Sequence, residues 1–534
     1  MTMAAMTMAS MTTASMTMDR DAMIQAASQG REPWDIVVIG GGATGASIAL
    51  DAASRGLRVL LLERSDFGKG TSSRSTKLVH GGVRYLAQGN IALVRDALRE
   101  RGRLARNAPH VVFERSFVVP CSNWLEFAWY RIGFWVYDLL AGKSDYRRSH
   151  GMRGSECIER VSTLKPDRAR WGVLYSDGQF DDTRLLIDIL RTACSLGAVA
   201  INYANVDQVV KDDSGNISGL RFVDLETDQA IEVSARCVVN AAGPFCDGVR
   251  RLDQPDCEPM VAASQGVHIV LPRSFLPGDT AIIVPKTSDG RVLFLIPWHD
   301  RVVVGTTDTP IPDAAIEPRA MEGEIEFLLR TSADYLVCPP TRSDVMSVFT
   351  GIRPLVRPKR ERGKTSSISR DHTIDISESG LITITGGKWT TARKMAQDCV
   401  DRCIGFRKLH ASPCGTENLA LARGESGHES PFDPYELTSA HRLVNNQDFD
   451  ERVVLDCIRN EMARTVEDVL ARRTRWLFLD VAVAEWMAPR VAEIMARELR
   501  RGPEWVSQQL QSFAKTAASF RIPGMTPAEK HSDS

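Results

Sequence analysis

The sequence predicts an α/β fold in three parts: a Rossmann-like domain, a second domain built on a sheet, and an α-helical domain at the C-terminus. A glycine-rich turn stands between two apolar runs at residues 34–64, alternating apolar segments follow one another from 265 to 308, and helix-like sequence dominates after 435. A chain of 534 residues is too long for one hydrophobic core and suits two or three.

Composition excludes several functions. Lys and Arg total 66 against 67 Asp and Glu, so the formal charge of -1 creates no overall field for nucleic acid. The 11 cysteines include no CxxC pair and no metal-like spacing with histidine, so we expect reduced thiols and no metal site. No run of about 18 uncharged apolar residues occurs, so a spanning helix is not expected.

The first 32 residues predict a disordered extension or a misassigned start. The stretch MTMAAMTMASMTTASMTMDRD is of low complexity and has no charge before Asp19, unlike the basic region of a signal peptide. Met18 and Met23 are candidates for the true start.

Residues 34–64 predict a strand, a glycine turn, a helix and a second strand that ends in an acid. Gly40 allows the tight turn, Gly42 lets the backbone approach a pyrophosphate, and Gly45 lets the helix pack on the strand. The N-terminus of that helix offers N–H groups to phosphates. This motif predicts a dinucleotide site without choosing NAD over FAD.

The residues after this motif add candidate cofactor contacts, and the long polar loop among them favours FAD. Glu63, 18 residues after Gly45, is placed to accept a hydrogen bond from a ribose hydroxyl. Arg64 follows it as a further cofactor-binding candidate. The polar loop at 67–86 is too long for a simple NAD-type crossover. It offers hydroxyl and N–H groups from Thr71, Ser72 and Ser73.

Two later strands also run into glycine, at CVVNAAGPF (237–245) and LITITGGKWTT (381–391). Three such junctions, far apart in the chain, indicate one nucleotide domain assembled from separate segments. The additional candidate cofactor-binding residues are Ala242, Gly243, Gly386, Gly387 and Thr390.

The motifs in their order resemble one family. The matching stretches are GGGATG, TSSRSTKLVHGGVRYL, YSDGQFDDTRL, VVNAAGPF, GVHIVLPR, VLFLIPWHDRVVVGTTDT, TGIRPL, SRDHTID and GGKWTTARKMA. From about residue 33 to the C-terminal region, the chain resembles the FAD-dependent glycerol-3-phosphate dehydrogenases, in particular the aerobic, membrane-associated respiratory type. The resemblance implies a glutathione-reductase-like flavin domain, a substrate domain with a mixed or antiparallel sheet, and a helical C-terminal domain.

The chain departs from that family in two places. Gln265 stands where the family commonly has a lysine, and no calcium-binding D-x-[DN]-x-[DN]-G loop occurs. The predicted boundaries are 1–32 for the extension, 33–404 for the oxidoreductase region, 405–434 for a linker and 435–534 for the helical domain. Within the oxidoreductase region we expect the flavin domain at about 33–80, 190–260 and 345–400, and the substrate domain at about 81–189 and 261–344.

The resemblance implies the substrate-binding residues. Arg353 and Arg370 match the ligands of the substrate phosphate, a role that suits the two-pronged guanidinium, and Arg84 matches a third cation near the reacting carbon. His268 is the candidate base, because imidazole titrates near neutrality; the alternative is a half-buried strand histidine with satisfied hydrogen bonds.

Four further residues are candidates around the flavin and substrate. Lys388 would stabilise negative charge on the flavin, although a lysine just after a glycine turn is often solvated. The others are Tyr85, Thr306 and Asp308.

The expected reaction is the oxidation of sn-glycerol 3-phosphate to dihydroxyacetone phosphate, with non-covalent FAD and a membrane quinone as electron acceptor. A glycerol-3-phosphate oxidase that uses oxygen stays open, as does a flavoprotein that senses or docks without turnover. An amino-acid or sarcosine-type oxidase is disfavoured by the matched phosphate arginines.

Residues 121–140, CSNWLEFAWYRIGFWVYDLL, predict an interfacial helix. Its rings suit a membrane surface, whereas Glu126, Arg131 and Asp138 make a spanning helix costly. The alternative is a helix whose rings belong to the core. A basic cluster follows it at Lys143, Arg147, Arg148 and Arg153. We therefore expect a cytoplasmic enzyme, peripheral on the cytoplasmic face of the inner membrane, and leave a homodimer open.

Overall fold

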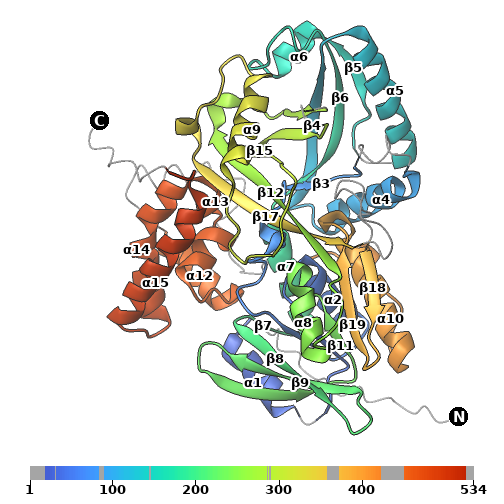
Figure 1. The fold of residues 1–534 in the computed structure, drawn as a ribbon, viewed down its shortest axis with the longest axis vertical. Helices are drawn as coiled ribbons and strands as arrows, with labels where there is room; N and C mark the ends of the chain where they lie inside the picture. The colour runs from blue at the N-terminus through green and yellow to red at the C-terminus, as the bar shows by residue number, and fades with distance from the viewer. Residues whose placement is uncertain are drawn as a thin grey trace, which may run out of the picture.

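The computed structural model describes residues 18–30, 32–82, 90–142, 146–285, 287, 290–357, 372–422 and 450–524. These residues form two large sheets surrounded by helices, with a helical domain at the C-terminal end (Figure 1). The predicted fold class is confirmed.

The first large sheet has six strands, and its neighbours run parallel except for the pair of β18 and β19. Its order is β18 (His372–Ile376), β19 (Leu381–Gly386), β11 (Val238–Asn240), β1 (Ile36–Ile39), β2 (Val59–Leu62) and β7 (Val199–Ile201). The four-residue strands IVVI of β1 and VLLL of β2 are buried throughout, as a sheet covered on both faces requires. Helix α2 (Ala43–Ser54) packs between α7 (Asp182–Ser195) and α10 (Ala392–Arg407).

A smaller antiparallel sheet extends the same region. It consists of β8 (Ala204–Lys211), β9 (Ile217–Asp224) and β10 (Gln229–Ser234), and α8 (Cys246–Asp253) packs against β8.

Part of the N-terminal segment is ordered, so the prediction of disorder up to residue 32 was wrong. Helix α1 (Arg20–Gln29) begins at the cap residue Asp19, whose carboxylate accepts two N–H groups. Met23 and Ala27, one helical turn apart, are buried against the domain. Arg20 pairs with Asp224 at 2.5 Å. The low-complexity stretch before residue 18 lies outside the described residues.

The second large sheet has ten strands and carries the expected mixed pairing, because β13 runs parallel to β4 within an otherwise antiparallel sheet. Its path is β16 (Thr309–Pro310), β12 (Val261–Pro272), β15 (Arg301–Gly305), β14 (Leu293–Trp298), β13 (Ala281–Val284), β4 (Val112–Cys121), β6 (Trp171–Phe180) and β3 (Leu78–Val79), with β17 (Ser347–Val356) on β12 and β5 (His150–Arg153) on β6.

Strand pairing moves two of the expected domain boundaries. β17 was expected in the flavin domain but pairs with β12 over ten residues, from Val261↔Val356 to Val270↔Ser347. The expected change of domain between residues 189 and 190 falls inside α7, which packs on α2. Both shifts place an element beside a distant partner, and a linear pattern of residues does not specify that partner.

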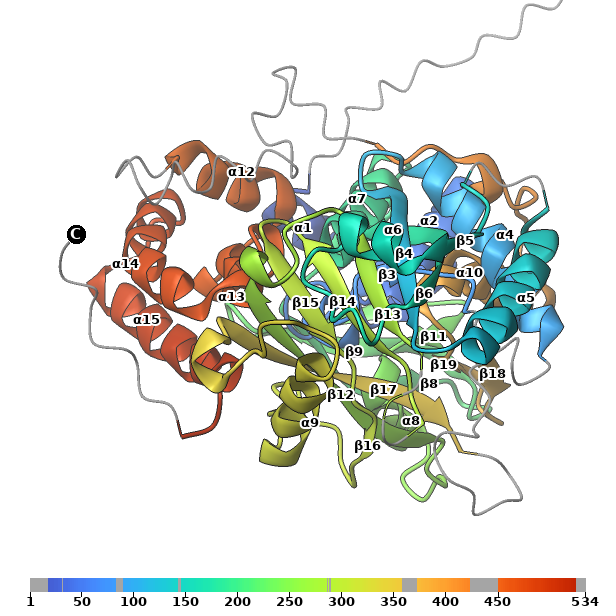
Figure 2. The ribbon, with the colours of Figure 1, turned by 90° about the horizontal axis from the view of Figure 1, so that it is seen from above.

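Helices cover the large sheet and form the C-terminal domain. On the sheet lie α4 (Ile91–Asn107), α5 (Trp124–Ala141), α6 (Gly154–Arg160) and α9 (Glu322–Ala333). The C-terminal helices are α12 (Glu451–Glu461), the π-helix η9 (Asp468–Arg473), α13 (Trp476–Leu479), α14 (Val481–Glu498) and α15 (Pro503–Ala517). Seen from above, these helices stand on the side opposite α4 and α5 (Figure 2). Among the described helices, none has both the length and the apolarity that crossing a bilayer requires.

Candidate functional site

A cavity of about 720 Å³ opens where strands of the parallel sheet end. Its lining comes from the glycine turn after β1, the segment after β2, the ends of β11 and β19, and residues of the large sheet. We call residues 63–73 the wall loop, because most of them form one side of this cavity. Ligands of open α/β sheets bind at this edge.

The glycine turn leaves no room for side chains. Gly40 has φ +110°, and a Cβ atom there would stand 2.7 Å from the carbonyl oxygen of Ala241. At Gly45 a Cβ atom would stand 1.9 Å from the carbonyl oxygen of Gly40, so only glycine lets α2 approach the turn. Gly42 lines the cavity at the N-terminus of α2, which is the position predicted for a pyrophosphate.

Glu63 lines the cavity and holds the backbone around it. Its carboxylate accepts the N–H groups of Gly41 at 2.7 Å and Ser65 at 2.8 Å. Burial raises the pKa of this carboxyl, and the two N–H groups counteract that rise. Each oxygen keeps a lone pair for a further donor, so the ribose contact stays a prediction that the geometry permits. Arg64 also lines the cavity.

The predicted hydroxyl groups of the wall loop separate into two groups. Thr71 and Ser72 line the cavity, and Ser72 accepts the N–H of Ala43 at 2.8 Å. Ser73 is buried behind the wall, where its carbonyl oxygen accepts Lys77 Nζ at 2.7 Å. The structure therefore favours Thr71 and Ser72 over Ser73 for contact with a cofactor.

The later glycine junctions meet at the same cavity. Ala242, Gly243, Gly386 and Gly387 line it, together with Lys388. Thr390 is instead buried beneath it, where its hydroxyl accepts the N–H of His80 at 3.2 Å.

Sequence reasoning missed several lining residues. Trp389 stands between two predicted candidates in GGKWTT, and its indole donates to the carbonyl oxygen of Ser72 at 2.9 Å. Phe245 and Arg357 also line the cavity. Trp389 could have been proposed from its place in the motif, whereas Arg357 carries no local signal.

Arg353 lies on β17 beside the cavity, since its neighbour Pro354 lines it. The guanidinium donates to the carbonyl oxygens of Gln265 and Thr307, to Thr306 Oγ1 and to Asp308 Oδ1, at 3.0 to 3.3 Å. About a fifth of this side chain is exposed, at 22%. Thr306 and Asp308 therefore orient Arg353.

His268 lies on β12, opposite Phe349 of β17. It is only 2% exposed, its ring stacks on Phe349 at 4.7 Å, and its Nε2 is 2.9 Å from Thr76 Oγ1. Its Nδ1 has no hydrogen-bond partner within the described residues, which disfavours the alternative of a fully satisfied histidine. Burial, then the charges of Lys77 and Arg353, lower the pKa of His268 well below 6.5, so the ring is neutral at physiological pH.

Lys77 is a buried charge that the sequence did not single out. Its Nζ pairs with Asp182 at 2.6 Å and lies 5.1 Å from the ring centres of Trp298, Phe349 and Phe478. Burial lowers its pKa to about 7.

Gln265 occupies the position where the resemblance expects lysine. Its amide donates to Glu324 Oε2 of α9 at 2.6 Å, and Glu324 also accepts from Thr307 and Thr309. Gln265 thus makes this hydrogen bond with a neutral amide. Three predicted residues, Arg84, Tyr85 and Arg370, lie outside the described residues. Within the described ranges, His, Cys, Asp and Glu side chains form no group of three that suits a metal ion.

Comparison with known proteins matches two families along the chain. Residues 35–393 match the family described as FAD dependent oxidoreductase, and residues 410–505 match the C-terminal domain of alpha-glycerophosphate oxidase. The second match begins inside the stretch expected to be a linker.

Relatives cover most of the chain. It is 39% identical to the mitochondrial glycerol-3-phosphate dehydrogenase of Macaca fascicularis over 541 residues, which span 92% of this chain and 74% of the relative. It is also 39% identical to the mitochondrial glycerol-3-phosphate dehydrogenase of Arabidopsis thaliana over 552 residues, 93% of this chain and 87% of the relative.

Solved structures agree with the fold. The glycerol-3-phosphate dehydrogenase of Bacillus halodurans, complexed with FAD, has a TM-score of 0.75 at 29% identity, covering 96% of this chain and 99% of that one. The L-alpha-glycerophosphate oxidase of Mycoplasma pneumoniae, with FAD bound, shares the fold at a TM-score of 0.56 and 14% identity over 74% of this chain and 99% of its own.

Proposed function

Because the chain belongs to the FAD-dependent glycerol-3-phosphate dehydrogenase family, we propose that it oxidises sn-glycerol 3-phosphate to dihydroxyacetone phosphate and passes the electrons to a membrane quinone. The observation that carries the proposal is the position of Arg353 at the edge of the cavity, because an oriented guanidinium there suits the substrate phosphate. Arg370 and Arg84 are proposed to assist it.

The residues of the cavity fit FAD. The glycine turn has no space for side chains, the N-terminus of α2 faces the cavity at Gly42, and Glu63 offers acceptor oxygens for a ribose. When bound, FAD accepts the hydride that leaves the substrate carbon. Lys388, on the cavity wall, is proposed to stabilise negative charge beside it.

His268 is proposed to take the proton from the substrate hydroxyl. If Nε2 donates to Thr76 Oγ1, the lone pair of the neutral ring lies on Nδ1, which is then the atom that accepts the proton. Thr76 therefore orients the base.

Anaerobic titration with glycerol 3-phosphate tests the reaction. Addition of the substrate to the purified yellow protein should bleach the flavin absorbance, and acid precipitation should release the flavin because it is not covalently bound. A spectrum that does not change under substrate would contradict catalysis and favour a docking role.

An oxidase is the second candidate, and the match of residues 410–505 to a domain named for alpha-glycerophosphate oxidase favours it. Both enzymes share the oxidation of the substrate and differ in the electron acceptor. Turnover with a soluble quinone analogue should exceed turnover with oxygen, whereas fast peroxide release would support the oxidase.

Helix α5 supports the proposed contact with a membrane. Figure 1 shows it at the outer edge of the molecule. Phe134 and Tyr137 face the core, whereas Trp129 and Leu125 are 70% and 79% exposed. The other large exposed apolar residues of α5 are Trp124, Ile132, Trp135 and Leu139. This exposed apolar face favours a helix lying in the membrane interface over a core helix. Glu126 and Asp138 each accept a backbone N–H group on this helix or beside it.

Cosedimentation with anionic vesicles tests this contact. Arg147 and Arg148 are exposed after the end of α5, so changing both to Glu should weaken binding, as should salt. Trp129→Ser should also weaken it. Trp486→Ser is the matched control, since Trp486 is 59% exposed on α14, far from α5 (Figure 2). Wild-type protein that stays in the supernatant at low salt would contradict the peripheral contact and the proposed location on the inner membrane.

A further inference from the structure

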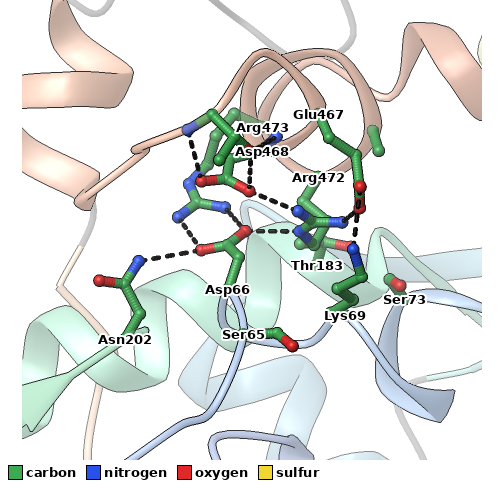
Figure 3. A network of polar contacts seen from close by, with 12 residues as sticks. Ser65, Asp66, Lys69, Ser73, Thr183, Asn202, Glu467, Asp468, Arg472 and Arg473 are labelled. Atoms are coloured by element: carbon green, nitrogen blue, oxygen red, sulfur yellow. Dashed lines mark hydrogen bonds and ion pairs between the residues drawn. The ribbon is translucent and has the colours of Figure 1, made fainter. Parts of the chain in front are cut away.

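The wall loop has two sides. Ser65, Gly68 and Lys69 line the cavity, while Asp66 and Phe67 are fully buried. Asp66 points instead toward the helices of the C-terminal domain (Figure 3). The loop therefore contacts the cofactor cavity on one side and another domain on the other.

Two arginines of the π-helix η9 bind the buried carboxylate of Asp66. Arg473 donates from both Nη atoms to the two carboxylate oxygens, at 2.7 and 2.9 Å, and Arg472 donates from Nε at 2.5 Å. Asn202 adds a contact at 3.3 Å. Because all three charged groups are buried, water does not weaken these contacts.

The same network also includes Lys69, a residue that lines the cavity. Arg472 also donates to Glu467 and Asp468 at 2.6 Å each, so three carboxylates share its charge. Glu467 in turn accepts Lys69 Nζ at 2.9 Å, and Lys69 lines the cavity (Figure 3). Two residues of the wall loop, three apart, are thus bound to residues 467–473 of the C-terminal domain.

We infer that the C-terminal domain positions the wall of the FAD cavity, with Asp66, Arg472 and Arg473 as positioning residues for the cofactor. The inference rests on the proposed function, because it takes the ligand of the cavity to be FAD. It gives the C-terminal domain a role that the sequence did not suggest.

The wall loop transmits this contact to the glycine turn. Gly68 donates its N–H to the carbonyl oxygen of Gly41 at 3.1 Å, and Phe67 packs against Gly41. If Asp66 loses its charge, Arg472 and Arg473 are left buried with one carboxylate fewer, and the wall loop loses its charged attachment to η9. Movement of the loop would displace Gly41 and the Ser65 end of the Glu63 hydrogen bonds.

A second bidentate pair provides a matched control. Arg464 of the C-terminal domain donates to both oxygens of Glu226 at 2.6 and 2.7 Å, and Glu226 lies in the turn between β9 and β10. This pair also joins the two domains but does not touch the wall loop. Glu226→Gln and Asp66→Asn therefore each remove one negative charge from a bidentate pair between the domains, and the Glu226 pair is the more exposed, at 15% and 16%.

The test measures the Kd of FAD for the full-length apoprotein by flavin fluorescence, with circular dichroism and the unfolding midpoint measured in parallel. Asp66→Asn should raise the Kd about tenfold or more, equivalent to roughly 1.4 kcal/mol. Glu226→Gln should leave the Kd unchanged. With saturating FAD, the KM for glycerol 3-phosphate should stay at the wild-type value in both variants.

Different failures point to different conclusions. An unchanged Kd for Asp66→Asn, with a lowered unfolding midpoint, would overturn the inference and leave the network a purely structural contact. If Asp66→Asn does not fold, the Kd of FAD is measured for Arg473→Lys instead, because this variant keeps the charge but loses the two-pronged contact. An unchanged Kd for Arg473→Lys would also overturn the inference. Wild-type apoprotein that binds no FAD would instead overturn the proposed function.

Discussion

Arg353 and Arg473 hold their guanidinium groups in opposite ways. Arg473 is 1% exposed and donates twice to one carboxylate at 2.7 and 2.9 Å. Arg353 is 22% exposed, and its contacts with Asp308 and with neutral oxygens span 3.0 to 3.3 Å. A short bidentate pair fixes one domain on another, whereas longer contacts at a cavity edge can be exchanged for those of a phosphate. The geometry thus separates an arginine that joins two domains from one that can bind a ligand at the cavity edge.

The comparison predicts that changes on the substrate side alter turnover most. His268→Gln should slow flavin reduction by roughly 10²- to 10⁴-fold, because a general base contributes that much. Substrate binding and flavin content should stay normal. Anaerobic stopped-flow measurement of flavin bleaching gives the rate, and near-normal kinetics would remove His268 as the base.

Arg353→Ala should have the next largest effect. The loss in kcat/KM for glycerol 3-phosphate should correspond to about 2 to 5 kcal/mol, because a buried phosphate would lose its charged partner. Arg353→Lys keeps the charge without the fork, so its main effect should be a raised KM. Plain glycerol is the control substrate. If wild-type enzyme uses glycerol as well as glycerol 3-phosphate, Arg353 does not bind a phosphate.

Much of the cavity lining could be predicted because its signals are local. Gly40, Gly42 and Gly45 stand within one strand, turn and helix, and the structure brings the later glycine junctions to the same cavity. Ser73 and Thr390 do not line the cavity, and the sequence gives no sign of the side that either hydroxyl faces.

Contacts between segments far apart in the chain could not be predicted, because they leave no local signal in the sequence. Arg473 and Asp66 are 407 residues apart, and nothing around either residue indicates the other. In α5 the rings occur nearly all round the helix, so periodicity could not show that Phe134 is buried and Trp129 exposed. α1 was missed because low complexity before it concealed the spacing of Met23 and Ala27.

Replacing Lys77, whose charge lowers the pKa of His268, should have a smaller effect, and that effect should be on the pH dependence of kcat/KM. Its charge helps to keep the pKa of His268 low, so Lys77→Met should raise that pKa. Because protonation removes the base, the acid limb of kcat/KM should then move to higher pH, by roughly one unit or less. Lys77 has a pKa of about 7 and is charged below that pH, where the limb lies. Lys77→Arg is the control that keeps a charge. A limb that stays in place, or moves to lower pH, would contradict this coupling.

Arg473→Lys should have the smallest effect on turnover. A lysine keeps a charge near Asp66 but offers one point of contact instead of the two-pronged fork, so domain attachment should weaken. The unfolding midpoint should fall, since breaking a buried pair outright costs about 3 to 5 kcal/mol and this variant retains part of it. With saturating FAD, kcat for glycerol 3-phosphate should equal the wild-type value, because Arg473 does not line the cavity. A kcat/KM that falls as far as in Arg353→Lys would show that contact geometry does not distinguish the two arginines.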